Sequence, residues 1–182
     1  MKNVFIFGLG YVGVPLAQAL ADQGWQIRGT TRTPSKLADK AGQGWQILPF
    51  QSGQPLADPA AAFANIDAII STITAIDGSD PVLDAHGDEL ANFSGWSGYV
   101  SATSVYPDMP HDICYEDTKV APATARGKAR VVAEARWEEA FGTEIFRAAG
   151  IYGVGRSPFD ALRDGTARII EREGQVFNRI HV

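Results

Sequence analysis

The feature that most constrains the fold lies near the N-terminus, in the run Gly8-Leu9-Gly10-Tyr11-Val12-Gly13. It follows the apolar segment Val4–Phe7 and precedes apolar residues at helical spacing. A G-x-G-x-x-G run in this position predicts a strand, a tight turn and a helix whose N-terminal N–H groups hold a pyrophosphate. Gly8 would permit the turn, Gly10 the approach of the phosphates, and Gly13 the packing of the helix on the strand. The alternative is a strand-to-helix turn without a ligand.

Strand and helix patterns alternate along the rest of the chain. Strands are predicted over Val4–Phe7, Trp25–Thr30, Trp45–Phe50, Ala68–Thr74, Gly98–Val105 and Glu144–Ala149. Besides the helix after the glycines, helices are predicted over Ser35–Ala41, Ala57–Ala64, Pro81–Phe93, Ala123–Phe141 and Ser157–Arg172, with a loop over Asp108–Pro122 and an extended tail over Gln175–Val182. Strands that are apolar on both faces and alternate with helices indicate a parallel sheet covered on both sides. We therefore expect an α/β protein with a doubly wound parallel sheet, the Rossmann fold.

Composition excludes several other classes of protein. The 182 residues are 45% hydrophobic and 20% charged, as expected for a folded chain rather than a disordered one. A net charge of −5 without a basic window disfavours nucleic acid and anionic membranes as partners. The single cysteine, Cys114, rules out an internal disulfide, and His86, His111 and His181 are too scattered to predict a metal site. Without a signal peptide or a membrane-spanning run, we expect a cytoplasmic protein.

The segment after the second predicted strand bears on the choice of dinucleotide. An NAD site usually has an acidic residue there, about 20 residues after the glycines, to bind the ribose 2′-hydroxyl. Here the segment Arg28–Thr33 contains no acid. A guanidinium forms charge-assisted bonds with a 2′-phosphate, so Arg32, assisted by Thr31 and Lys36, favours NADP(H) over NAD(H). The alternative is that Arg32 is a solvated loop residue.

Two further runs carry a family resemblance. These are Tyr99-Val100-Ser101-Ala102-Thr103-Ser104-Val105-Tyr106 and Arg147-Ala148-Ala149-Gly150-Ile151-Tyr152-Gly153-Val154-Gly155-Arg156. With the glycine run they resemble, over essentially the whole chain, the extended short-chain dehydrogenase/reductases, also called the NAD-dependent epimerase/dehydratase family. The resemblance implies that Ser71, Thr72, Tyr11 and Val12 line the cofactor and that Gly150 and Ile151 lie by the nicotinamide. Ser71 and Thr72 could instead cap a turn, and Gln51 could contact the adenine or be an ordinary loop residue.

The catalytic pattern of that family is altered here. Family members use a Ser or Thr, a Tyr and a Lys, and the matching positions hold Ala102, Arg126 and Arg130. Ser101 and Thr103 flank Ala102, and Thr103 could substitute for the missing hydroxyl. Arginine stays protonated and cannot replace the tyrosine as acid or base. The chain thus resembles the atypical branch, in which the two arginines could bind an anionic substrate or cofactor phosphates, or be structural.

Two local alternatives limit this interpretation. Arg130 could simply form an i, i+4 ion pair with Glu134, which would contribute little to stability.

The segment Tyr115-Glu116-Asp117-Thr118-Lys119 has the spacing of the family's catalytic Y-x-x-x-K motif. It lies before Pro122, which disfavours a continuous helix that would align Tyr115 with Lys119, so we interpret it as an acidic surface loop.

These observations predict a domain organisation and a function. Residues 1–156 would form an NADP(H)-binding domain, and 157–182 would begin a C-terminal substrate region that is largely absent. The function would be that of an oxidoreductase or epimerase-like enzyme acting on an unknown small molecule. The alternatives are a non-catalytic NADP(H) sensor or regulatory protein and a scaffold that binds no cofactor. Family members often dimerise through the helices matching Pro81–Phe93 and Ala123–Phe141, so the resemblance leaves a homodimer as one possible state of this chain.

Overall fold

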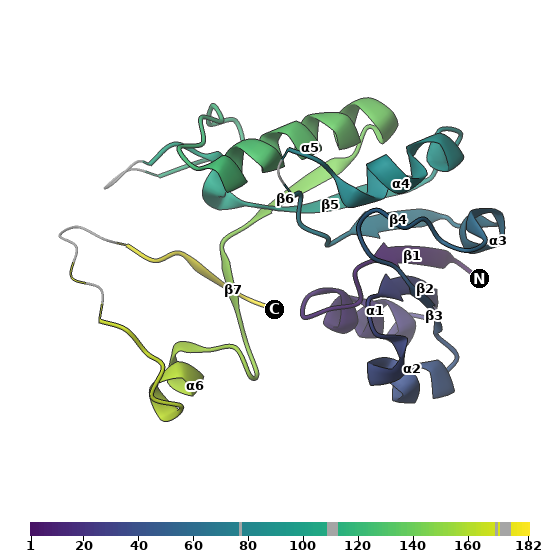
Figure 1. Ribbon diagram of the computed structural model, residues 1–182, viewed down its shortest axis with the longest axis horizontal. Helices are drawn as coiled ribbons and strands as arrows, with labels where there is room; N and C mark the ends of the chain where they lie inside the picture. Colours follow the sequence, from purple (N-terminus) through teal and green to yellow (C-terminus); the bar gives the residue numbers. More distant parts are fainter. Residues whose placement is uncertain (77, 109–112, 170, 172–175) are drawn as a thin grey trace.

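Six parallel strands form the central sheet, in the order β3-β2-β1-β4-β5-β6 (Figure 1). The computed structural model describes residues 1–76, 78–108, 113–169, 171 and 176–182. The strands of this sheet are β1 (Asn3–Phe7), β2 (Gln26–Thr31), β3 (Gln46–Pro49), β4 (Ala68–Ser71), β5 (Trp96–Ala102) and β6 (Glu144–Ala148). The direction of winding reverses between β1 and β4, which confirms the doubly wound Rossmann fold.

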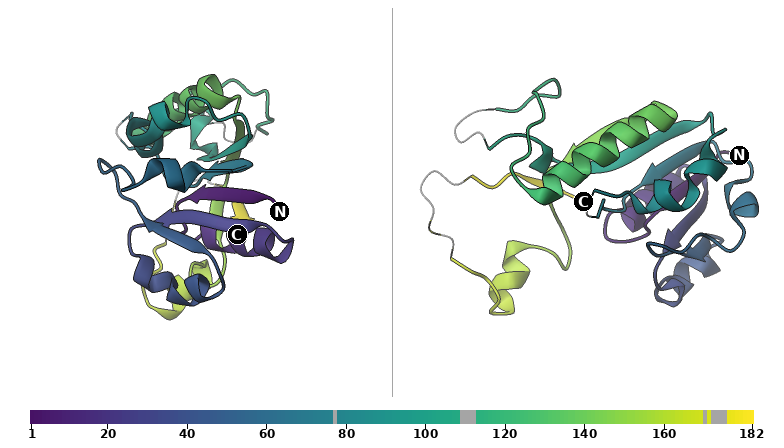
Figure 2. Two further views of the ribbon diagram at one scale, coloured as in Figure 1. Left: turned by 90° about the vertical axis from the view of Figure 1, so that its right-hand side faces the viewer. Right: turned by 45° about the horizontal axis from the view of Figure 1, so that its top comes forward.

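Helices cover both faces of the sheet, as Figure 2 shows. On one face lie α1 (Gly13–Asp22) and α2 (Ala38–Gly42), the latter preceded by a 3₁₀ turn, Pro34–Leu37. On the other face lie α3 (Pro59–Phe63), α4 (Pro81–Leu90) and α5 (Ala125–Phe141). Within the described ranges, no helix is long and apolar enough to cross a membrane.

The central strand β1 contributes to both halves of the core. Phe5 and Phe7 point into the cluster under α4 and α5, and Val4 and Ile6 point into the cluster under α1. All four side chains are fully buried. Successive residues of a strand face opposite sides, so an uninterrupted apolar run is what a strand buried on both faces requires.

The elements differ from the predicted ones mainly at their ends. The fourth strand stops at Ser71 instead of Thr74, and the Thr72 hydroxyl just beyond its end bonds the backbone oxygens of Phe7 and Gly8. The fifth strand ends at Ala102, and a 3₁₀ turn covers Thr103–Val105. The last helix, α6, spans only Pro158–Arg163, since Gly165 at φ +66° leaves the helical conformation. Parts of three predicted segments lie outside the described residues, namely 109–112 with His111, residues 170 and 172, and the start of the tail at Gln175.

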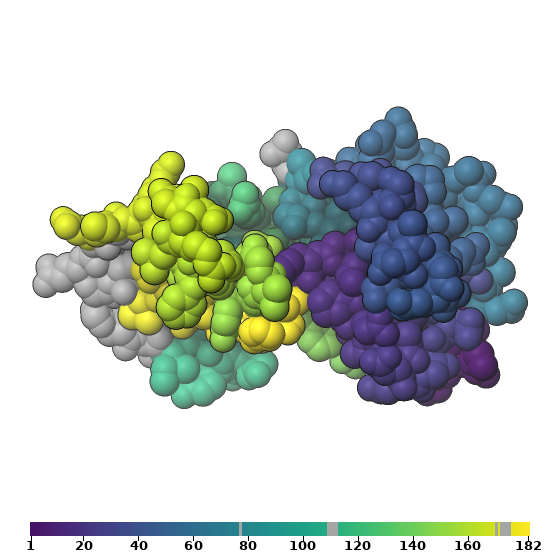
Figure 3. All heavy atoms as spheres, turned by 90° about the horizontal axis from the view of Figure 1, so that it is seen from below, coloured from purple at the N-terminus to yellow at the C-terminus, as the bar shows by residue number. Residues whose placement is uncertain are grey.

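The segment after β6 leaves the main sheet. Strand β7 (Gly150–Tyr152), which sequence patterns did not predict, pairs in parallel with β8 (Arg179–His181) inside the predicted tail. Large apolar side chains are exposed along this segment, such as Val154 at 94% and Phe159 at 75%. In Figure 3 the yellow-green segment forms a lobe beside the purple and blue N-terminal part.

Candidate dinucleotide and substrate cleft

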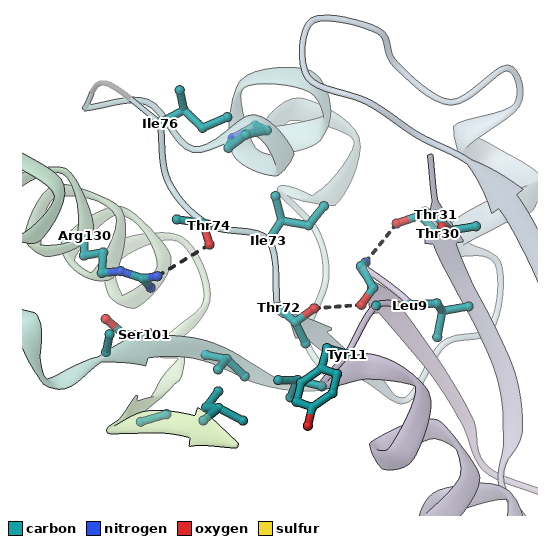
Figure 4. A pocket seen from close by; sticks show the side chains of 18 of the residues that line it. Leu9, Tyr11, Thr30, Thr31, Thr72, Ile73, Thr74, Ile76, Ser101 and Arg130 are labelled. Carbon is teal, nitrogen blue, oxygen red and sulfur yellow. Dashed lines mark hydrogen bonds between the residues drawn. The ribbon is translucent and has the colours of Figure 1, made fainter. Parts of the chain in front are cut away.

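A cleft of about 1200 Å³ lies beyond the carboxyl ends of the strands (Figure 4). Its walls come from the glycine loop after β1, the ends of β2, β4, β5 and β6, and the first turns of α5. Ligands of open α/β sheets bind at this edge, where the winding direction reverses. The residues singled out from the sequence that line the cleft are Gly8, Gly10, Tyr11, Val12, Thr31, Arg32, Gln51, Thr72, Ser101, Ala102, Thr103, Arg126, Arg130, Gly150 and Ile151.

The glycine loop needs its glycines for different geometric reasons. Gly8 has φ +96°, and a Cβ there would lie 2.6 Å from the Thr72 hydroxyl oxygen. A Cβ on Gly13 would overlap the carbonyl oxygen of Gly8, so the helix could not start where it does. At Gly10 a Cβ would meet no atom within 4 Å. The backbone at Gly10 is therefore open toward the cleft, as close approach by a phosphate requires.

Two threonines hold this loop in place. The Gly8 N–H donates to the Thr30 hydroxyl at 3.0 Å, and the Leu9 N–H donates to the Thr30 carbonyl at 2.6 Å. The Thr72 hydroxyl donates to the Gly8 carbonyl at 2.7 Å. Sequence reasoning missed Thr30, whose only signal was a hydroxyl at the end of a predicted strand. The side chain of Thr72 thus positions the loop, in addition to lining the cleft.

The start of α1 is suited to an anion. Val12, the residue before the helix, makes no side-chain cap, and the first turn contains no acidic residue. The Val14 N–H donates to the Gly10 carbonyl at 3.0 Å and Pro15 has no N–H, so a phosphate would use the N–H groups just ahead of them, from Tyr11 to Gly13, where the helix dipole also favours an anion. Arg156 lies over the ring of Tyr11 with its guanidinium carbon 5.3 Å from the ring centroid.

The charge of the cleft is positive. Four guanidinium groups line it, those of Arg32, Arg126, Arg130 and Arg156, and no Asp or Glu is among its described lining residues. Sequence reasoning did not assign Arg156 to the site, although it ends the run that carried the resemblance. Lys36, expected to assist Arg32, is not among the lining residues. Arg28 is engaged elsewhere, donating to the Ala62 carbonyl at 2.6 Å and so capping α3.

The far side of the cleft is formed by β5 and α5. The Arg130 Nη2 donates to the Thr74 hydroxyl at 3.4 Å, whereas its buried Nε has no hydrogen-bond partner (Figure 4). The ion pair between Arg130 and Glu134 that the spacing suggested is not formed, because the Glu134 carboxylate bonds Arg147 at 2.9 Å. This bond raises the pKa of the Arg147 guanidinium above its usual value.

Two of the expected cofactor residues do not line the cleft. Gly13 packs beneath Gly8, and Ser71 is fully buried with its hydroxyl unpaired. The literal Y-x-x-x-K is not helical, since α5 begins at Ala125 and the Tyr115 N–H donates to the Thr118 hydroxyl in a turn.

Three titratable groups are buried behind the cleft. Burial lowers the pKa of His86, whose Nε2 accepts a hydrogen bond from the Leu56 N–H at 3.1 Å. Burial raises the pKa of Asp80, which caps α4 and accepts from the Trp137 indole at 3.1 Å. Burial also raises the pKa of Tyr99 to about 12. Among the residues described, no group of three or more His, Cys, Asp or Glu side chains could hold a metal ion.

Known proteins match this chain along most of its length. Residues 3–119 match the family described as the NAD binding domain of 6-phosphogluconate dehydrogenase. Protein YeeZ of Escherichia coli strain K12 is 32% identical over 170 residues, which covers 87% of this chain and 62% of YeeZ.

Solved structures agree with these sequence matches. A functionally unknown conserved protein from Silicibacter pomeroyi is 37% identical with a TM-score of 0.86, covering 100% of this chain and 64% of that one. A Methylobacillus flagellatus protein, provisionally described as an NAD-dependent epimerase/dehydratase, is 25% identical with a TM-score of 0.69, covering 99% and 65%. The chain therefore spans less than two thirds of the length of these three relatives.

Proposed function

Because the chain belongs to the family of NAD binding domains represented by that of 6-phosphogluconate dehydrogenase, we propose that it binds NADP(H) in preference to NAD(H). We further propose that it acts as an oxidoreductase or epimerase-like enzyme on a small molecule. The observation that carries the proposal is a cleft that joins a glycine phosphate cradle to arginines without an ion-pair partner, and no carboxylate is among its described lining residues.

Each part of the cleft has a role in this proposal. The pyrophosphate would lie on the backbone of Gly10, Tyr11 and Val12, above the start of α1. Gly150 and Ile151 would lie by the nicotinamide, which supplies hydride transfer when the cofactor is bound. Gly8, Gly13 and Thr72 would act indirectly, by shaping the loop. Ser71, which is fully buried beneath the residues that line the cleft, would support them by packing.

The preference for NADP(H) rests on the end of β2. Thr31 and Arg32 follow one another there and both line the cleft. Within the described ranges Arg32 makes no ion pair, so its guanidinium is available to a 2′-phosphate. An acidic residue that would bind a 2′-hydroxyl and repel a phosphate is missing from the described lining.

The other side of the cleft supports an enzyme over a sensor. Ser101, Thr103, Arg126 and Arg130 extend the cleft past the glycine loop. In the proposed reaction the Thr103 hydroxyl orients the substrate oxygen, and the arginines bind negative charge. No arginine moves the proton, because guanidinium stays charged at neutral pH.

The domain division is part of the same proposal. The strands of the main sheet are complete at Ala148, and the cleft lining extends only to Arg156. Residues 1–156 would then be the dinucleotide-binding domain and 157–182 the start of a substrate region that continues in the longer relatives. A homodimer would use the outer faces of α4 and α5.

The test is a fluorescence titration with NADPH and, in parallel, with NADH. We expect tighter binding of NADPH, weakened about 10- to 100-fold in Arg32→Ala because a charge-assisted bond is lost. NADH affinity should not change in this variant. Arg136→Ala, which removes an exposed arginine paired with Asp84 outside the cleft lining, is the matched control. Equal affinity for both dinucleotides would contradict the proposed preference, and binding of neither would contradict the proposed function.

A further inference from the structure

We propose that Arg130 and Ser101, with Arg126 beside them, form an oxyanion subsite that takes a negatively charged group of the substrate. The proposal deepens the function proposed above and rests on it for the position of the nicotinamide. It assigns the substrate to the class of small molecules that carry a carboxylate or phosphate close to the reacting carbon.

The first support is the state of the Arg130 side chain. Its Nε is buried without a hydrogen-bond partner, and Nη2 makes only the 3.4 Å contact with the Thr74 hydroxyl. Nε and Nη2 form one edge of the planar guanidinium, the edge that binds two oxygens of one anion. An unsatisfied buried donor is unfavourable, so a ligand that supplies acceptor oxygens here would be stabilised.

The second support is an unpaired hydroxyl in the same cleft. Ser101 is 3% exposed and its Oγ has no hydrogen-bond partner. Figure 4 shows it on β5, on the same side of the cleft as the Arg130 guanidinium. Two buried polar groups from different elements thus line one space with their donors unused. That arrangement is expected where a polar ligand completes the bonding.

The third support is the absence of a competing carboxylate among the described neighbours. Glu134, one turn further along α5, is held by Arg147 at 2.9 Å. Asp80 accepts from two backbone N–H groups at the start of α4 and from Trp137. Within the described residues, neither Arg130 nor Arg126 has an ion-pair partner. Their positive charge is therefore available to a ligand.

Sheet order separates this subsite from the phosphates of the dinucleotide. The glycine loop follows β1, and Arg32 follows β2, whereas Ser101 lies on β5. With about 4.8 Å between strands, β5 lies roughly 10 Å from β1 and roughly 14 Å from β2. The pyrophosphate and the 2′-phosphate would be held on the opposite side of the cleft. The anion at Arg130 would then belong to the substrate.

The experiment is isothermal titration calorimetry with malonate and with inorganic phosphate, at constant ionic strength, on the chain saturated with NADP⁺ and on the chain alone. We expect one of the two anions to bind, and Arg130→Gln to weaken it at least about tenfold, because a charge-assisted bidentate contact is lost. Ser101→Ala should weaken it several-fold, and Arg130→Lys should retain part of the affinity through its charge. Arg136→Gln, on the same helix but paired with Asp84, should leave anion affinity unchanged.

The titration of NADPH into the same variants distinguishes the two sources of the anion. We expect Arg130→Gln to bind NADPH like the unaltered chain, which also shows that the variant is folded. If Arg130→Gln loses NADPH and anion affinity together, Arg130 binds a cofactor phosphate and the proposal is overturned. Binding of neither anion to the unaltered chain overturns it as well. If the chain binds no dinucleotide but loses anion binding in Arg130→Gln, the subsite stands and the proposed function fails.

Discussion

The two sides of the cleft are built in different ways. On the glycine-loop side, the loop is shaped by glycines close together in the sequence, and its backbone groups bond to Thr30 and Thr72. On the Arg130 side, the lining comes from separate elements, and buried atoms of Arg130 and Ser101 have no partner. A site formed by backbone can be read from a short motif, whereas a site formed by distant side chains cannot.

The strongest test of this contrast is at the glycines. Gly13→Ala should destabilise the fold by about 3 kcal/mol or more, because the new Cβ overlaps the Gly8 carbonyl oxygen in a packed interior. Gly10→Ala should change the free energy of unfolding by less than about 1 kcal/mol, since its Cβ would meet no protein atom within 4 Å. It should nevertheless weaken NADPH binding, because the added Cβ would occupy space that the phosphates need. Urea unfolding and NADPH titration measure the two effects. Normal NADPH affinity in Gly10→Ala would refute close approach of the phosphates at this residue.

The second test concerns the frame behind the Arg130 side. Arg147→Ala should destabilise the fold by about 2–4 kcal/mol, since it leaves the Glu134 carboxylate, 5% exposed, without its partner. Replacing both residues, as Glu134→Gln with Arg147→Met, should restore most of the loss because no charge is left buried. Denaturant unfolding of the unaltered chain and of the two variants provides the measurement. Equal losses in the single and double variants would mean that packing, and not charge, explains the effect.

A smaller effect on stability is expected from His86, buried behind the cleft, as the pH is lowered. His86 has a folded-state pKa below its ordinary value of about 6.5, because the folded protein buries it. Below about pH 6.5 the unfolded chain therefore binds a proton that the folded chain does not, and stability falls as the pH decreases. Melting temperatures of the unaltered chain and His86→Gln between about pH 5 and 8 should differ in slope, the variant losing less stability at acid pH. Parallel slopes would contradict this assignment.

The smallest effect is expected on the outer surface of α5. Arg136 bonds Asp84 at 2.7 Å, but both side chains are more than a third exposed. Solvent and salt weaken such a pair, so Arg136→Ala should cost less than about 1 kcal/mol and leave NADPH binding unchanged. A loss of stability as large as that in Arg147→Ala would show that the difference in solvent exposure does not explain how much each ion pair stabilises the fold.

Much of the fold could be predicted from periodicity alone. Runs such as Val4–Phe7 are apolar at every position, which fits a strand buried on both faces, and the parallel sheet is confirmed. The glycine loop was predictable because the residues it requires lie within one short stretch of the sequence. The ends of β4 and β5 were not: beyond β4 the Thr72 hydroxyl bonds the Gly8 carbonyl, 64 residues away in the sequence, and beyond β5 a 3₁₀ turn covers Thr103–Val105.

The rest of the candidate site depends on tertiary contacts without a sequence signal. Arg130 and Glu134 have the spacing of an ion pair within one helix, and only the structure shows that Arg147, on strand β6, binds the glutamate. Arg156 reaches Tyr11 across the cleft, and β7 pairs with a tail strand beyond α6. Spacing along a chain defines neighbours within one element, but not the order in which strands lie side by side.

The central position of β1 has a consequence for how the chain is made. Asn3, at its start, bonds the Asp67 carboxylate, 64 residues further along the chain. At about 5–20 residues per second, a ribosome needs roughly 3–13 s to synthesise that stretch. During this time β1, whose four apolar side chains are fully buried in the folded protein, can pair with β2 but lacks its second neighbour. The nascent chain would present that open edge to chaperones before the phosphate cradle is complete.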